Sequence, residues 1–356
     1  MIATTMASQQ ETKTVARAAA KPHSRLEQRL AAAADVRPRK TLSFYRYVAI
    51  SDPAEFRERL FKKWSEFDAL GRIYVAKEGV NAQMNVPVEY WTEWDTWTQA
   101  QPELAGVPYK IAVEEKGPSF YKLAIKVRPK IVADGLDDAA FDPANTGEYL
   151  TAAEMNEYVN NPDAVIVDMR NAYESEIGHF EGAIIPDVDT FREELEVVPE
   201  ILRAHKDKKI ALYCTGGIRC EKASAWLKHQ GYKNVKHLKG GVIDYKHQVE
   251  REGLPNKFRG KNFVFDERLS ETIGEEVISV CHLCRRNKTD QYRHCNFETC
   301  HVLHLACEDC VAKRAGYCSG VCRQLDRLPA KTKKVYTRFY NRYFRPKMFK
   351  KTRLRA

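Results

Sequence analysis

The short stretch YCTGGIRCEK contains two cysteines and a Gly-Gly pair, and so combines reactive sulfur with a backbone suited to holding negative charge. The stretch contains, in order, Cys214, Thr215, Gly216, Gly217, Ile218, Arg219 and Cys220. Two successive glycines can adopt positive φ, so that neighbouring N–H groups point toward one centre. Such amides, a following helix N-terminus and the charge of Arg219 together lower the pKa of a thiol. The stretch therefore predicts a nucleophilic thiolate at Cys214.

Two other interpretations of this loop explain less of it. A cysteine at the end of a buried strand can be a small hydrophobic residue, but that role requires neither the glycines nor the arginine. A phosphatase loop places one residue more between its cysteine and its arginine than the four that separate Cys214 from Arg219. The tighter ring favours a group the size of sulfur or oxygen over a tetrahedral phosphate.

The segments around Cys214 alternate in the order typical of a parallel α/β sheet. The helix-like segments are 151–160 and 188–205, and the strand-like segments are 164–170, 208–214 and 235–241. A further helix is predicted to begin near Glu221. In such a sheet, ligands bind at the carboxyl ends of the strands, where Cys214 lies. We therefore expect an α/β catalytic domain over 148–255.

A separate α+β unit is expected over 41–130. Its strands and helices follow the order βαββαβ, with a hairpin around Gly79 and room for an extra strand. This order is typical of a ferredoxin-like, or acylphosphatase-like, sandwich. Asp52 and Pro53 are placed to begin its first helix. Residues 131–147 are rich in Asp, Gly, Pro and Asn and form a predicted linker, so the chain is expected to be an α/β and α+β multidomain protein.

Residues 1–40 are rich in Ala, Thr and Arg, with only three acids, and are expected to form a disordered arm. An organelle transit peptide has a similar composition, whereas the apolar segment of a secretory signal is absent. No run of about 18 apolar residues suggests a membrane span. We therefore expect a cytoplasmic protein whose thiols stay reduced and serve catalysis or metal binding.

Eight further cysteines lie in a predicted metal-binding module over 256–328. They form four close pairs: Cys281 with Cys284, Cys295 with Cys300, Cys307 with Cys310, and Cys318 with Cys322. Paired thiolates at such spacing suit two structural zinc sites of four cysteines each. The spacing leaves open whether the pairs combine consecutively or interleave. Nearby histidines could replace a cysteine, and an iron–sulfur cluster is the alternative to zinc; these histidines are His282, His294, His301 and His304.

The net charge of +10 is concentrated in the tail at 329–356, where eleven Lys and Arg follow position 330 without an acid. Aromatic residues alternate with these cations. Cations neutralise phosphates and aromatic rings stack on unpaired bases, so the tail is a candidate RNA-binding segment. Its candidate contacts are Lys333, Lys334, Arg338, Arg342 and Arg345. A solvated basic terminus is the alternative, and the absence of a clean apolar face disfavours a membrane-surface role.

Several segments together resemble one family of enzymes. VIVDMRNAYESEIGHFEGAI, YCTGGIRC and GYKNVKHLKGGVIDY are similar to the three signatures of a rhodanese domain. With TLSFYRYVAISDP, VAKEGVNAQMNVP, KVRPKIVADG and GKNFVFDER, residues 41–325 resemble the rhodanese-domain tRNA uridine(34) hydroxylases. That resemblance implies oxygen-dependent conversion of the wobble uridine in a tRNA anticodon loop to 5-hydroxyuridine, with dioxygen as co-substrate.

The resemblance also assigns roles to individual residues. Cys214 matches the essential cysteine, and Cys220 matches a second thiol that could resolve an oxidised Cys214 as a disulfide. Asp168 and Arg170 match an Asp-x-Arg at the end of a rhodanese strand, and we interpret them as local hydrogen-bonding partners that hold the loop in shape. His179 is interpreted as a turn-stabilising residue rather than a general base.

Two other functions fit the same residues. A persulfide sulfurtransferase would pass sulfur from Cys214 to an acceptor, and a non-enzymatic RNA-binding adaptor would retain only the fold. A conventional oxygenase is disfavoured because no Gly-x-Gly-x-x-Gly follows a strand and because the only His-x-Asp, at His205 and Asp207, lies in a charged loop. The sequence leaves the electron donor and the oligomeric state open.

Overall fold

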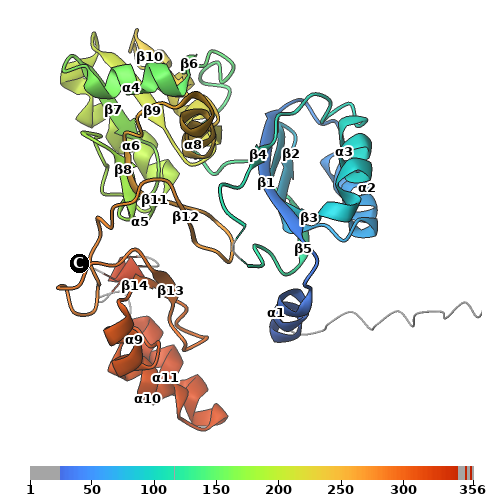
Figure 1. The fold of residues 1–356 in the computed structure, drawn as a ribbon, viewed down its shortest axis with the longest axis vertical. Helices are drawn as coiled ribbons and strands as arrows, with labels where there is room; N and C mark the ends of the chain where they lie inside the picture. Colours follow the sequence, from blue (N-terminus) through green and yellow to red (C-terminus); the bar gives the residue numbers. More distant parts are fainter. Residues whose placement is uncertain (1–24, 116, 344–348, 351–352, 355–356) are drawn as a thin grey trace, which may run out of the picture.

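The computed structural model describes residues 25–115, 117–343, 349–350 and 353–354. The chain forms an N-terminal sheet unit, a central α/β unit and a C-terminal cysteine-rich module (Figure 1). Among the helices of the described residues, none has the length and apolar character needed to cross a membrane.

The N-terminal unit is a sheet covered on one face by helices. Its elements are β1 (Arg39–Tyr47), α2 (Pro53–Glu66), β2 (Leu70–Ala76), β3 (Gly79–Pro87), η1 (Val88–Tyr90), α3 (Trp91–Gln99), β4 (Lys110–Ile111) and β5 (Leu123–Val127). The strand order is β4-β1-β3-β2-β5, in which β5 pairs parallel to β2 and the other pairings are antiparallel. The first four strands confirm the predicted ferredoxin-like arrangement, and β5 is the extra strand. The Asp52 side chain caps α2 as predicted, accepting from the amides of Ala54 and Glu55.

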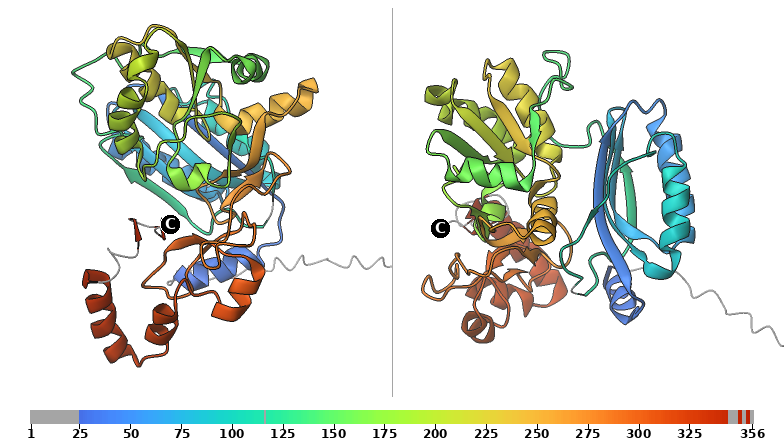
Figure 2. Two further views of the ribbon diagram at one scale, coloured as in Figure 1. Left: turned by 90° about the vertical axis from the view of Figure 1, so that its left-hand side faces the viewer. Right: turned by 45° about the horizontal axis from the view of Figure 1, so that its top comes forward.

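Alternation along the strands separates an apolar face from a polar one. Phe44 and Ile73 are fully buried and pack with Trp64 of α2. The intervening residues point to the other face, because successive strand side chains alternate. Figure 2 shows that α2 and α3 cover the first face, while the second is turned toward the central unit. This polar face therefore becomes a wall of the region around Cys214.

The central unit is built on a parallel sheet of order β6-β10-β9-β7. Its elements are β6 (Glu148–Leu150), α4 (Ala152–Asn160), β7 (Ala164–Asp168), α5 (Ala172–Ser175), β8 (Gly178–Phe180), α6 (Phe191–Ile201), η2 (Arg203–His205), β9 (Lys209–Tyr213), α7 (Ile218–His229), β10 (Val235–Leu238) and α8 (Gly241–Glu252). The predicted parallel α/β sheet is confirmed. The helix after Cys214 begins at Ile218, three residues before the predicted start near Glu221, because Gly217 turns the chain at φ 98° directly into it.

After α8, the chain first adds two strands beside β8 of the central unit. Strand β11 (Phe258–Phe263) pairs antiparallel with β8, and β12 (Ser270–Thr272) pairs with β11. The cysteine-rich module follows, with β13 (Tyr292–His294), β14 (Leu303–Leu305), α9 (Glu308–Arg314), α10 (Gly320–Asp326) and α11 (Ala330–Tyr343). Two short strands, β15 (Phe349–Lys350) and β16 (Arg353–Leu354), complete a small sheet with β13 and β14.

The expectation of a disordered arm over 1–40 is wrong for part of that range. Helix α1 (Arg25–Ala34) is formed by Arg, Leu, Glu, Gln and Ala, which all have high helix propensity. Arg29 of this helix forms an ion pair with Glu267 at 2.7 Å, and β1 already begins at Arg39. Residues 1–24 lie outside the described residues.

Candidate active site and metal centres

Cys214 lies between the end of β9 and the start of α7, where the chain curls back on itself. The backbone N–H of Gly217 donates to Cys214 Sγ at 3.1 Å. From the other side, the amides of Val242 and Ile243 donate to the carbonyls of Cys214 and Thr215 at 3.0 and 3.3 Å. The loop is therefore closed by its own glycine and supported by the first turn of α8.

Gly241 is a supporting residue that sequence reasoning missed. It has φ 68°, and a Cβ at this position would collide with the carbonyl oxygen of Cys214. Only glycine therefore allows α8 to approach the loop closely enough for the hydrogen bonds from Val242 and Ile243. The Gly-Gly that follows the β10 segment in the sequence was the signal for this close approach.

The environment of Cys214 favours the ionised sulfur. Burial by itself would raise the pKa of this thiol, but a hydrogen bond from Cys220, the positive charge of Arg219 and the backbone amides of Arg219 and Cys220 lower the pKa to about 5. Burial and the neighbouring Cys214 charge raise the pKa of Cys220 well above its usual value. At neutral pH the pair is thus a thiolate at Cys214 that accepts a hydrogen bond from a protonated Cys220.

Arg219 does not stand free in the loop, because it is held by a buried carboxylate from α5. Its two terminal nitrogens donate to the Glu174 carboxylate at 2.6 and 2.9 Å, and Thr215 Oγ1 donates to the same carboxylate at 3.2 Å. Glu174 is fully buried and its pair with Arg219 fixes the loop to α5. Sequence reasoning missed Glu174, whose only signal was its place just after the Asp-x-Arg.

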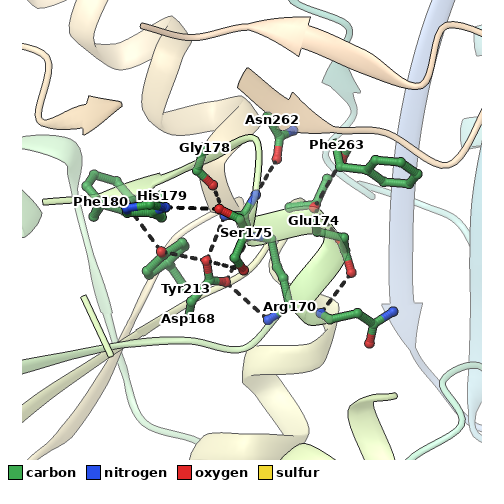
Figure 3. A network of polar contacts seen from close by, with 12 residues as sticks. Asp168, Arg170, Glu174, Ser175, Gly178, His179, Phe180, Tyr213, Asn262 and Phe263 are labelled. Atoms are coloured by element: carbon green, nitrogen blue, oxygen red, sulfur yellow. Dashed lines mark hydrogen bonds and ion pairs between the residues drawn. The ribbon is translucent and has the colours of Figure 1, made fainter. Parts of the chain in front are cut away.

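Asp168 and Arg170 form a buried network of polar contacts with residues of α5, β8, β9 and β11 (Figure 3). Arg170 donates to the Asp168 carboxylate through Nε at 2.8 Å and Nη2 at 2.7 Å. The hydroxyls of Ser175 and Tyr213 donate to the same carboxylate, each at 2.7 Å. The network joins the end of β7 to α5 and to β9, which are the elements that carry Glu174 and Cys214.

The histidine near this network also has a structural partner. His179 Nδ1, in β8, lies 2.9 Å from the carbonyl oxygen of Ser175, the last residue of α5, so this contact spans the turn between the two elements (Figure 3). Arg170 further donates to the carbonyl of Gly178 at 2.6 Å and to Asn262 of β11 at 3.2 Å. These contacts tie the turn and β11 together.

A cavity of about 390 Å³ lies over the loop between the central and N-terminal units. Cys214, although 0% exposed at the molecular surface, lines this cavity together with Arg219. The opposite wall is the polar face of the N-terminal sheet, and it includes Ser43, Tyr45, Arg72, Tyr74, Asn81 and Gln83. Cys214 is therefore closed off from bulk solvent and lies in the wall of this cavity.

Two N-terminal residues contact the loop region directly, although they lie more than 100 positions away in sequence. Tyr45 donates to Glu221 of α7 at 2.8 Å, and a Cβ on Gly217 would come within 2.9 Å of the Tyr45 hydroxyl. The Lys110 amine lies 4.5 Å from the centre of the Tyr45 ring, and burial lowers its pKa. Only glycine at 217 therefore permits this packing of the N-terminal unit against the loop.

The eight late cysteines gather into two groups of four. One group is Cys281, Cys284, Cys307 and Cys310, and the other is Cys295, Cys300, Cys318 and Cys322. Within each group the sulfur atoms lie within 4.8 Å of one another. Three of the Sγ–Sγ distances are 3.6, 3.7 and 3.9 Å. Thiolates about 2.3 Å from a tetrahedral metal ion would be roughly 3.8 Å apart. Both groups could thus hold a metal ion. The cysteine pairs interleave along the chain: the first pair joins the third pair in one group, and the second pair joins the fourth in the other.

The four nearby histidines do not join either group in the described part of the chain. His282 Nε2 lies 2.7 Å from Glu176, and His294 stacks on His301 with ring centres 4.4 Å apart. Tyr292 of the module also donates to Glu176 at 2.7 Å. The module is therefore attached at Glu176, directly after α5, the helix that carries Glu174.

The predicted RNA contacts of the tail lie on or beyond α11. Lys333 forms an ion pair with Asp326 at 2.9 Å, whereas Lys334, Arg338 and Arg342 are exposed. Arg345 lies outside the described residues.

Three family models match consecutive parts of the chain. The model described as UPF0176 acylphosphatase like domain matches residues 39–131, the Rhodanese-like domain matches 151–248, and the Rhodanase C-terminal model matches 259–323. The first match covers the N-terminal sheet, and the second covers the sheet that carries Cys214. The third runs from β11 through all eight cysteines.

Whole-chain relatives carry one shared description. A tRNA uridine(34) hydroxylase from Leptospira interrogans is 49% identical over 296 residues, covering 83% of this chain and 80% of that protein. The protein of the same name from Photorhabdus laumondii is 48% identical over 297 residues, covering 83% and 84%. One from Escherichia coli is 48% identical over 290 residues, covering 81% and 83%.

Proposed function

Because the chain belongs to the tRNA uridine(34) hydroxylase family, we propose that it is an oxidoreductase that converts the wobble uridine of tRNA to 5-hydroxyuridine, with Cys214 as the reacting side chain. The observation that carries this proposal is a cysteine in the wall of a cavity between two domains, with the backbone N–H of Gly217 donating to its sulfur at 3.1 Å. This environment lowers the pKa of Cys214 to about 5. The cavity is proposed to receive the uracil base, and the sulfur is the group in its wall best suited to attack that base.

The thiolate solves the difficulty that carbon 5 of uracil is a weak nucleophile. Addition of Cys214 Sγ to carbon 6 forms a C–S bond and moves an electron pair onto carbon 5 and O4 as an enolate. Arg219 lines the cavity and keeps further N–H donors beyond those used by Glu174, so it can stabilise the negative charge that develops on the base. The loop thereby activates carbon 5 for attack on an oxidant.

Dioxygen is the proposed oxidant. The enolate carbon 5 adds to dioxygen and becomes a hydroperoxide once its outer oxygen is protonated. Loss of the carbon 5 proton then breaks the C–S bond and releases Cys214 as a thiolate. The freed Cys214 and the protonated Cys220 beside it supply two electrons that reduce the hydroperoxide to the carbon 5 hydroxyl group and water, and they close to a disulfide that an external thiol reduces. Atoms and electrons thus balance without a metal or flavin in the reacting centre.

A rival route keeps the same residue but changes its role. A peroxide would first oxidise Cys214 to a sulfenic-type species and leave as water or an alcohol. The sulfenic oxygen would then pass to carbon 5 as the S–O bond breaks, which returns Cys214 to the thiolate, and Cys220 would reduce, by disulfide formation, any sulfenic species that has not transferred its oxygen. The two routes differ in whether a covalent bond forms between the protein and the RNA.

Trapping with 5-fluorouridine distinguishes these routes. Fluorine at carbon 5 cannot leave as the proton does, so after addition of Cys214 the adduct should persist. We expect a protein–RNA conjugate whose modified peptide, analysed by mass spectrometry, carries the RNA on Cys214. The control is the same RNA with unmodified uridine, which should release the protein. Complete absence of the conjugate from an active preparation would contradict addition to carbon 6.

The match to a rhodanese-like domain favours one alternative activity, transfer of persulfide sulfur from Cys214. The small, donor-lined ring suits a terminal sulfur as well as a thiolate. This alternative requires sulfur transfer with thiosulfate as donor together with normal 5-hydroxyuridine levels in cells that lack the protein.

The remaining parts are proposed to deliver tRNA to this site in the cytoplasm. Zinc is the proposed occupant of both four-cysteine groups, where it would fix the module beside α5. The cations Lys334, Arg338 and Arg342 on α11 are proposed to contact RNA phosphates. Lys333, on the same helix, forms an ion pair with Asp326.

A further inference from the structure

The cavity over Cys214 continues past Tyr74 into a second hollow of about 500 Å³. The two hollows share Tyr74, Ile131 and Ala133, so they lie end to end. The second hollow is lined by Arg128, just after β5, and by Arg192, in the first turn of α6. One arginine from each domain therefore lines this adjoining hollow, whose edge we call the mouth of the cavity.

These two arginines carry charge that nothing in the described part of the chain neutralises. Both side chains are exposed and neither forms an ion pair there. The acid in the same wall, Asp134, is already paired with Lys130 at 2.8 Å and lies 3.7 Å from Lys222. The mouth of the cavity is thus a positively charged surface, because the Asp134 carboxylate is already paired with Lys130.

The local structure holds both arginines at the mouth. The Arg128 guanidinium lies 5.6 Å from the centre of the Tyr74 ring, a cation–π arrangement. Arg192 lies against Gly135, which has φ 75°, and a Cβ at Gly135 would collide with the Arg192 side chain. The glycine therefore leaves room for Arg192 beside the linker.

A uridine must leave its stack to reach Cys214, because this residue is 0% exposed and lies in the wall of the cavity. Enzymes that act on a base in this way swing the nucleotide out of the stack and into a pocket. The base then lies inside, and its flanking phosphates stay at the mouth. Two uncompensated guanidinium groups at the mouth match two phosphates in charge and in hydrogen-bonding geometry.

We propose that the second hollow is a subsite for the sugar–phosphate backbone of a flipped-out uridine. Arg128 and Arg192 bind the phosphates on either side of that nucleotide, and Tyr74, between the hollows, packs against it. This inference rests on the proposed function, which supplies the uridine. The inference adds where the RNA backbone lies and which residues bind it. None of these residues belongs to the catalytic loop.

The test compares R128Q/R192Q with a control that loses the same charge elsewhere, K62Q/K233Q. Lys62 lies on the helical face of the N-terminal unit, and Lys233 precedes β10 at the end of the sheet opposite Cys214; both are exposed. An anticodon stem-loop RNA is the probe. Its binding is measured by fluorescence anisotropy across a salt series, and its hydroxylation by nucleoside mass spectrometry.

For R128Q/R192Q we expect at least about tenfold weaker binding, a correspondingly raised KM and a kcat within about twofold of wild type. The slope of log affinity against log salt should fall by about 1.4, which is about 0.7 for each of two phosphates. K62Q/K233Q should keep the wild-type slope. If the two double variants bind with equal affinity and equal slope while the wild type hydroxylates normally, this inference is overturned and the proposed function stands. If the wild type leaves uridine unmodified, the proposed function is overturned and this inference with it.

Tyr74 provides a second readout that does not depend on charge. Y74A should weaken binding of the uridine RNA about fivefold or more, but should leave binding of the same RNA with an abasic residue at that position unchanged. Y74F keeps the ring and should restore wild-type binding. Equal losses of affinity for the uridine and abasic RNAs would contradict packing against the flipped nucleotide.

Discussion

Replacing Cys214 with serine should lower the rate of uridine hydroxylation by at least about a thousandfold. A serine hydroxyl stays protonated at neutral pH and is a weak nucleophile without an adjacent base. The hydrogen bond from the Gly217 amide can still be accepted by the serine oxygen, so the loop should keep its shape. The loss should therefore be chemical rather than structural.

The measurement is nucleoside mass spectrometry of tRNA treated with each purified protein. Tight binding of the anticodon stem-loop and an unchanged thermal unfolding temperature serve as controls that Cys214→Ser is folded. If this variant retains more than about a tenth of wild-type hydroxylation, Cys214 is not the nucleophile and the proposed chemistry is wrong.

Removal of bound metal should unfold the cysteine-rich module while leaving the two sheets folded. Two ions per chain are expected, one in each four-cysteine group, because a segment this small depends on metal for its folding energy. Zinc sites should be colourless, whereas an iron–sulfur cluster would absorb visible light. A strong chelator combined with a thiol-binding mercurial should release both ions and make residues 277–326 sensitive to protease.

Loss of the module should also lower hydroxylation, since His282 and Tyr292 contact Glu176, close to the carboxylate that holds Arg219. Cys284→Ala should bind about one ion instead of two, and Cys220→Ala, outside both groups, should keep two. Two retained ions in Cys284→Ala, or a protease-resistant module after metal removal, would contradict this account.

The candidate loop could be predicted from sequence because its chemistry is local. Cys214, the glycines and Arg219 are close in the chain, and a strand before them and a helix after them fix their geometry. The ferredoxin-like strand order and the cap at Asp52 follow from equally local patterns of apolar spacing and side-chain hydrogen bonding.

The partners of the loop could not be predicted, because they come from distant segments. Glu174 lies 45 positions before Arg219, and Tyr45 and Lys110 come from another domain. Their approach depends on how whole elements pack, which periodicity within one segment does not encode. The sequence predicts a positive charge at Arg219 beside the thiol, but not the buried carboxylate of Glu174 that pairs with it.

Two other features of the structure were also not predicted from the sequence. The interleaved arrangement of the cysteine pairs depends on how β13, β14 and the short helices fold over one another, since each pair alone fits either arrangement. Helix α1 was hidden by a composition that resembles disordered segments as a whole, although residues 25–34 have high helix propensity.

The most direct test of the central claim is the pH dependence of alkylation at Cys214. Native protein with its metal bound is treated with iodoacetamide at each pH, and the rate constant at Cys214 is followed by peptide mass spectrometry. We predict an apparent pKa of about 5, with a rate constant that is already constant between pH 6.5 and 8. A rate constant that instead rises about tenfold per pH unit up to pH 8, as for an ordinary thiol of pKa about 8.5, would contradict an ionised Cys214.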